Sequence, residues 1–167
     1  ALSGLGLVQC DLGEYAKAKE DLLEALELFR QFDRKVGIAD TLTGLCQAAF
    51  RLGEIEAAQQ FGQQSLEVYQ EIGDYWGVAI AFNNLGRMAA ETGDYGEAKR
   101  LYQEGVALYQ RIGIKAGWAN TLGNLGEACC ELGDYAGARR YVNQALQIAQ
   151  EIGANPGIWK MGNDQGT

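Results

Sequence analysis

The chain contains no histidine, and this removes most of the catalytic chemistry that side chains commonly supply. Serine and cysteine hydrolases use an imidazole as general base, and most catalytic zinc and iron sites use it as a ligand. The sequence also lacks a glycine-rich phosphate-binding loop. We therefore predict that the protein is not an enzyme and that it uses no cofactor.

Carboxylates and thiols are the remaining candidates for metal chemistry. Glu127 and Glu131 lie one helical turn apart, which suits a carboxylate metal site. Neither a histidine nor a second acidic helix segment accompanies them, so we expect no metal. The cysteines stand at positions 10, 46, 129 and 130 without Cys-x-x-Cys spacing. We interpret them as buried, reduced thiols of a cytoplasmic protein, with a metal or disulfide role as the alternative.

Net charge limits the partners of this chain. It carries 14 Lys and Arg against 22 Asp and Glu, a formal net charge of −8. Nucleic-acid binding depends on basic surfaces, so we predict no nucleic-acid partner. No apolar run of about 18 residues is present, which predicts no transmembrane helix and no membrane partner. The first residues, ALSGLGLVQC, contain neither an initiator Met nor a basic signal-peptide region, and we interpret the chain as an excerpt of a larger protein.

The sequence aligns with itself without a gap when it is written in rows of 40 residues. A fixed period of this size is typical of repeat arrays. Many of the 23 glycines fall into columns, so their abundance reflects repeated positions and not flexibility. The clearest columns are Leu5, Leu45, Leu85 and Leu125; Gly13, Gly53, Gly93 and Gly133; Ala18, Ala58, Ala98 and Ala138; and Gly37, Gly77, Gly117 and Gly157. We predict a single array over 1–167, with repeats 1–40, 41–80, 81–120 and 121–160 and a tail 161–167.

Each repeat predicts two antiparallel helices. Apolar residues recur in steps of three and four, as at Leu42, Leu45 and Ala49, without the two-residue alternation of strands. A glycine followed by Asp or Glu separates the two halves; it suits a left-handed helix end, and the carboxylate suits the next helix start. The predicted helices are 1–12, 15–32, 37–52, 55–72, 77–92, 95–112, 117–132 and 135–152, with a ninth helical stub from about 157 to 164.

These motifs resemble the tetratricopeptide repeat (TPR) family, whose pattern is W-x2-L-G-x2-Y, then A-x3-F, then proline. Leu122-x2-Leu125-Gly126 matches the first part and Ala98-x3-Tyr102 the second. The period of 40 and the missing proline are similar to the long-repeat variety found in kinesin light chains, Leu-Gly-Asn-type scaffolds and bacterial signalling regulators. The resemblance implies an all-α fold: a right-handed TPR superhelix (α-solenoid) of four helix-turn-helix repeats plus a C-terminal helical stub.

The resemblance also implies where a ligand binds, because first helices line the concave face of a TPR superhelix. Asn84 and Asn124 share a column in which several family members hold a peptide backbone with an asparagine. An amide both donates and accepts, so it can pair with an extended main chain. The alternative is a solvated helix surface with pairs such as Arg87–Glu91. The candidate peptide-binding residues are Thr43, Gln47, Arg51, Asn83, Asn84, Arg87, Glu91, Asn120, Asn124, Glu127 and Glu131.

Together these features predict a protein-protein interaction scaffold that binds an extended peptide or a helix in its concave groove. The alternative function is a sensor or regulatory TPR arm of a bacterial multidomain ATPase or transcription regulator. We predict a protein or peptide partner, and the regulatory alternative adds a small inducer or the protein's own ATPase domain. Apolar stacking faces at 1–12 and near 157–167 further predict end-to-end self-association of the array.

Overall fold

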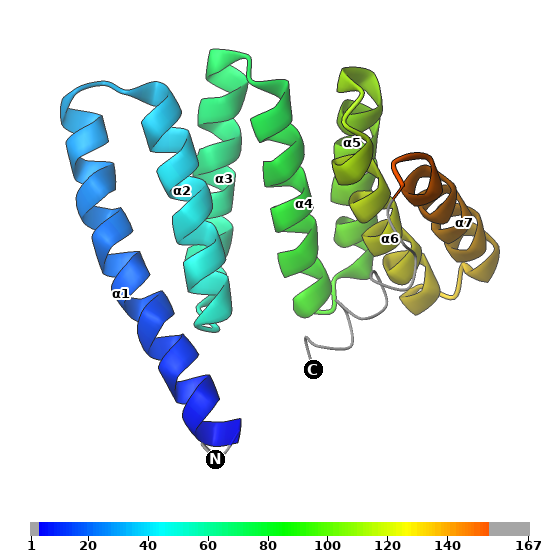
Figure 1. The fold of residues 1–167 in the computed structure, drawn as a ribbon, viewed down its shortest axis with the longest axis horizontal. Coiled ribbons are helices and arrows are strands. Elements are labelled where there is room, and N and C mark those ends of the chain that lie inside the picture. The colour runs from blue at the N-terminus through cyan, green and yellow to red at the C-terminus, as the bar shows by residue number, and fades with distance from the viewer. Residues whose placement is uncertain (1–3, 154–167) are drawn as a thin grey trace. The chain divides into compact units, whose positions relative to one another are not determined.

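The structure is a computed structural model, and it describes residues 4–153 of the chain (Figure 1). These residues form α-helices and no strand. The predicted all-α fold class of helix-turn-helix repeats is confirmed, while the predicted stub at 157–164 and the tail at 161–167 lie outside the described residues. The helices are α1 (Gly4–Gln31), α2 (Lys35–Arg51), α3 (Ile55–Ile72), α4 (Tyr75–Glu91), α5 (Tyr95–Ile112), α6 (Lys115–Glu131) and α7 (Tyr135–Glu151).

The chain folds as two compact units, residues 1–88 and residues 89–167. The first unit contains α1, α2, α3 and most of α4; the second contains the end of α4 with α5, α6 and α7. Within the described part of the chain, no helix is long and apolar enough to span a bilayer. Of the predicted end-to-end faces, Leu12 is exposed, and the other side chains lie outside the described residues.

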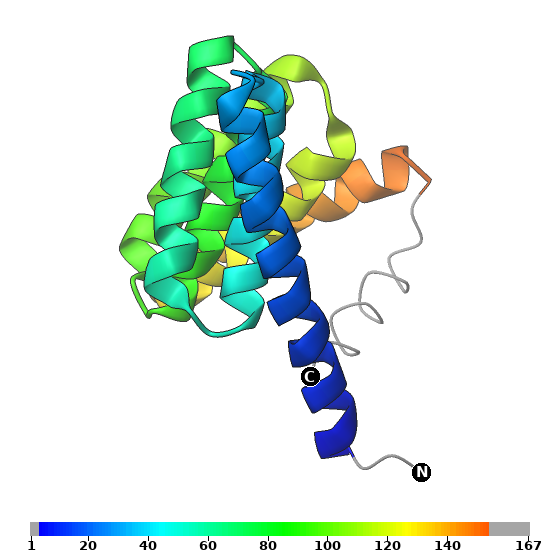
Figure 2. The same cartoon turned by 90° about the vertical axis from the view of Figure 1, so that its left-hand side faces the viewer.

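The first repeat corrects the sequence prediction. Separate helices were expected at 1–12 and 15–32, but α1 is one continuous helix from Gly4 to Gln31. Its N-terminal half extends beyond α2 and α3 (Figures 1 and 2). Gly13 lies inside the helix and is exposed, with nothing within 4 Å of an added Cβ. Because no packed neighbour there stabilises a reversal of the chain, the uninterrupted helix keeps backbone hydrogen bonds that a turn would break.

The other predicted helix boundaries are correct to within two residues. The reason is that these helices begin and end at residues whose own backbone and side-chain preferences define a helix end. Gly53, Gly93 and Gly133 are left-handed, with φ of 77°, 81° and 78°, as the turn prediction requires. The Asp94 carboxylate caps α5 by accepting the N–H of Glu97 at 3.0 Å. First helices α2, α4 and α6 begin two residues earlier than predicted, so the second glycine column lies in their first turn.

At the glycines of this second column (Gly37, Gly77 and Gly117), an aromatic ring of the preceding helix packs against the backbone. A Cβ added at Gly77 would overlap the ring of Tyr69, and one at Gly117 would overlap the ring of Tyr109. Both tyrosines are buried. A first helix can therefore approach the preceding second helix closely only where glycine stands in this column.

Small residues also set the packing of each unit, as the repeat columns predicted. Ala58 and Ala98 are fully buried. A Cβ added at Gly126 in α6 would lie 2.8 Å from Val142 Cγ2 of α7 and 3.3 Å from the carbonyl oxygen of Ala138. The largest fully buried side chains are leucines of α2 and α6, namely Leu42, Leu45, Leu122 and Leu125.

Besides the local pairs Lys35–Asp33 and Arg100–Glu97, ion pairs at the protein surface join residues 35 or 36 positions apart and thus link neighbouring repeats. Such pairs contribute little to stability because water screens them. They do identify the carboxylates whose charge a lysine side chain already neutralises. In the first unit they are Lys19–Glu54 and Lys35–Glu71 (3.3 Å), and in the second Lys99–Asp134 (3.3 Å) and Lys115–Glu151 (3.1 Å).

Candidate functional site

The predicted site residues all lie on the first helices α2, α4 and α6, and they divide between the two units. Those of the first unit are Thr43, Gln47, Arg51, Asn83, Asn84 and Arg87. Those of the second are Glu91, Asn120, Asn124, Glu127 and Glu131.

Thr43 belongs to a polar contact between α2 and α3. Its hydroxyl donates to the Ala39 carbonyl at 3.0 Å and lies 3.2 Å from the hydroxyl of Tyr69. The Tyr69 hydroxyl in turn donates to Asp40 Oδ1 at 2.8 Å. Burial raises the pKa of Tyr69 to about 12, so the phenol stays protonated at neutral pH. These contacts give Thr43 a role in holding the two helices together.

The two arginines of the first unit lie over aromatic rings. The guanidinium carbon of Arg87 is 5.2 Å from the ring centroid of Phe50, and that of Arg51 is 6.0 Å from the ring centroid of Tyr15. Stacking of this kind holds a guanidinium along the protein surface. The two guanidinium groups therefore add positive charge to this part of the first unit.

Asn84 is 6% exposed, which leaves its amide little access to a ligand. It lines a crevice of about 10 Å³, close to the smallest space that holds one water molecule. A peptide main chain does not fit there without rearrangement. The crevice is completed by Cys46, Gln47, Phe50, Arg87 and Met88.

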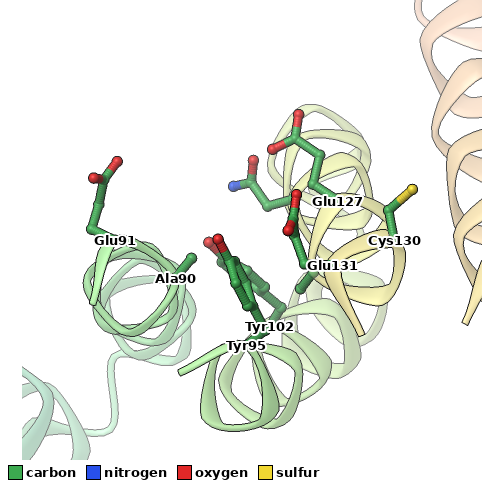
Figure 3. A pocket seen from close by; sticks show the side chains of 9 residues that line it. Ala90, Glu91, Tyr95, Tyr102, Glu127, Cys130 and Glu131 are labelled. Carbon is green, nitrogen blue, oxygen red and sulfur yellow. The ribbon is translucent and has the colours of Figure 1, made fainter. Parts of the chain in front are cut away.

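One pocket of the second unit collects four of the predicted residues (Figure 3). Its volume is about 500 Å³, within the range of ligand pockets. Glu91, Asn124, Glu127 and Glu131 line it, whereas Asn120 is exposed elsewhere on α6. The remaining lining residues are Ala90 at the end of α4, Tyr95 and Tyr102 of α5, and Ala128 and Cys130 of α6.

Two tyrosines that the sequence analysis did not select form the floor of this pocket. In Figure 3 the rings of Tyr95 and Tyr102 point into the space between Glu91 on α4 and Glu131 on α6, while the Cys130 thiol points away. Tyr102 is only 3% exposed. The repeat alignment contained a sign that Tyr102 is unusual. The other residues of its column are Leu22, Gly62 and Val142, and none of them has a polar side chain.

The pocket is acidic. None of its nine lining residues is a lysine or an arginine. Among the described residues of this unit, ion pairs involve the carboxylates of Glu97, Asp134 and Glu151, and none involves Glu91, Glu127 or Glu131. Three carboxylates around one concavity produce a negative potential that attracts cations.

Cys46, Cys129 and Cys130 are free thiols, and the side chain of Cys10 lies outside the described residues. Cys46 and Cys129 are buried as predicted, whereas Cys130 is exposed, which corrects the prediction for that residue. Burial raises the pKa of Cys46 to about 12 and also raises that of Cys129. Both therefore stay protonated and unreactive at neutral pH. Over the residues that the structure describes, no group of three or more His, Cys, Asp and Glu side chains could hold a metal ion.

Comparison with known sequences identifies one family. Sequence models of the tetratricopeptide repeat match residues 1–71, 37–111 and 119–152. No curated protein matches the chain by sequence.

Solved structures share the fold. BtubC (BKLC) from P. vanneervenii is similar at a TM-score of 0.78 and 23% identity, over 86% of this chain and 59% of its own. The TPR domain of Arabidopsis FLU is similar at 0.66 and 21% identity, over 70% of this chain and 98% of its own. A Rap protein complexed with competence and sporulation factor is similar at 0.78 and 16% identity, over 84% of this chain and 39% of its own. The chain thus spans only part of the length of BtubC and of the Rap protein.

Proposed function

The chain belongs to the tetratricopeptide repeat family, and we propose that it is a protein-interaction scaffold that binds an extended segment of a partner protein along its first helices. The observation that carries the proposal is the pocket of the second unit. Glu91, Asn124, Glu127 and Glu131 come from two different first helices and line one concavity of about 500 Å³. The sequence pattern had selected all four.

The polar groups of the pocket suit a peptide. Asn124 is half-buried on the pocket wall, where its amide can both donate to and accept from a main chain. Each such hydrogen bond contributes about 0.5–1.5 kcal/mol net. The similar Rap structure, which is complexed with competence and sporulation factor, supports the view that this fold can hold a ligand.

Selection of peptides by the full chain tests this function. The protein is immobilised, a library of random dodecapeptides is selected against it, and the affinity of the enriched peptides is measured by fluorescence anisotropy. Asn124→Ala should weaken binding about 3- to 10-fold, the loss expected for one or two hydrogen bonds. The matched control is Asn143→Ala, which removes an exposed asparagine of α7 that does not line the pocket.

Two results would count against the proposal. Enrichment of no peptide sequence would argue against peptide binding altogether. Equal affinities of the Asn124 and Asn143 variants, with unchanged helical circular dichroism, would remove the pocket from the binding surface.

A further inference from the structure

We propose that the pocket of the second unit is a specificity subsite for one basic side chain, lysine or arginine, of the bound segment. The inference rests on the proposed function and adds the chemical class of the recognised residue. It is carried by three features of the same cavity: its shape, its aromatic floor and its unneutralised carboxylates.

The cavity is large enough for a long side chain. Its volume of about 500 Å³ lies between the end of α4 and α6, above α5. The rings of Tyr95 and Tyr102 form the floor; Tyr95 is half-buried and accessible to a ligand, whereas Tyr102 is only 3% exposed. Lysine and arginine place an alkyl stem along apolar surface and carry the charge at its tip. A cation above the ring of Tyr95 is attracted by its π system, and a phenol oxygen can accept a hydrogen bond from the cation.

Carboxylates flank this floor on both sides. In Figure 3 the Glu131 carboxylate on α6 lies beside the tyrosine rings, and the Glu91 side chain on α4 points upward at the opposite edge of the pocket. Neither they nor Glu127 form an ion pair with any described residue of the unit. An ammonium or guanidinium group in the cavity can thus form charge-assisted hydrogen bonds, which are stronger than those between neutral groups. A bound divalent cation is not favoured, because no metal-binding cluster is found over the described residues.

The repeats provide an internal comparison. The column of Glu127 holds Arg87 in the first unit, and that of Glu131 holds Arg51. Beside Arg87, the first unit has a crevice of only about 10 Å³. A basic side chain is therefore favoured in the pocket of the second unit and disfavoured beside Arg87 in the first.

The test uses the random dodecapeptide selection on the full chain, followed by matched synthetic peptides. Enriched peptides should share one lysine or arginine, and replacing it by norleucine should weaken binding about 10-fold or more. The triple variant Glu91→Gln, Glu127→Gln, Glu131→Gln should bind the basic and norleucine peptides equally. Its affinity should also lose the salt dependence of the unmodified protein.

A charge-matched control separates the pocket from net charge. The triple variant Glu24→Gln, Glu56→Gln, Glu104→Gln removes three exposed carboxylates outside the pocket, and it should retain the preference for the basic peptide. Circular dichroism checks that both variants fold. If the pocket triple variant is unfolded, Glu131→Lys supplies the readout: it should reject the basic peptide and accept one in which glutamate replaces the basic residue.

The possible outcomes distinguish failure of the basic subsite from failure of peptide binding itself. Enriched peptides without a shared basic residue, or with one that both triple variants bind equally well or equally weakly, would overturn the subsite and leave peptide binding intact. Enrichment of no peptide would overturn the proposed function and the subsite with it.

Discussion

Replacement of Gly13 by alanine should stabilise the protein, because Gly13 lies within the continuous helix α1. A Cβ added there meets nothing within 4 Å, so no packing energy is gained or lost. What remains is helix propensity, which favours alanine over glycine by about 0.5–1 kcal/mol in a helix interior.

The turns of the next two repeats provide controls that differ in backbone conformation alone. A Cβ added at Gly53 or Gly93 also meets nothing within 4 Å, but these residues have φ of 77° and 81°. An L side chain in this left-handed region costs about 1–2 kcal/mol. The same substitution should therefore have opposite signs at Gly13 and at Gly53 or Gly93.

Urea unfolding followed by circular dichroism measures this difference. For an m value near 2 kcal/mol/M, Gly13→Ala should raise the midpoint by about 0.3–0.5 M, and Gly53→Ala should lower it by about 0.5–1 M. Amide hydrogen exchange near residue 13 gives a local readout, because repeat arrays can unfold in parts. Destabilisation by Gly13→Ala comparable to that by Gly53→Ala would refute the continuous helix and restore the turn expected from the sequence.

Two further predictions concern helix junctions of the second unit. Gly117→Ala should destabilise the protein by about 1–3 kcal/mol, because the new methyl group overlaps the ring of Tyr109; an unchanged urea midpoint would contradict this. The second concerns Asp134, whose pKa is held below its usual range, first by the backbone N–H of Gly137 and then by Lys99. Its folded-state pKa is below the unfolded value, so its stabilisation is present above about pH 4 and is lost as the pH falls through the lowered pKa. Asp134→Asn keeps the capping oxygen without the charge and should flatten the acid part of a melting-temperature profile; profiles of equal slope would count against the assignment.

The sequence predicted α3 and α5 to the residue, and the reason is local. A glycine that can adopt positive φ ends each preceding helix, and a carboxylate follows it at the next helix start. The same local pattern failed at Leu12-Gly13-Glu14-Tyr15, which repeats the turn signature but stays helical. A turn signature permits a reversal of the chain, but packing of the two helices against each other must stabilise it.

In the candidate site, too, some features followed from local sequence and others only from the packing of the helices. Repeat columns identified the first-helix faces, and with them four residues of one pocket. They did not separate Asn84 from Asn124, which share a column although one is buried at a narrow crevice and the other lines the pocket. The sequence also identified Tyr102 only as part of the repeat motif, whereas its ring forms part of the pocket floor.

The sequence by itself determined the repeat, the helices from α2 onwards and the positions that must stay small, because caps, φ preferences and helical periodicity depend on residues a few positions apart. The tertiary structure decided whether the first turn forms, which asparagine a ligand can reach and where carboxylates surround a cavity. These depend on the side chains that neighbouring helices bring together, such as Phe50 with Arg87, and residues so far apart in sequence meet only when the repeats pack.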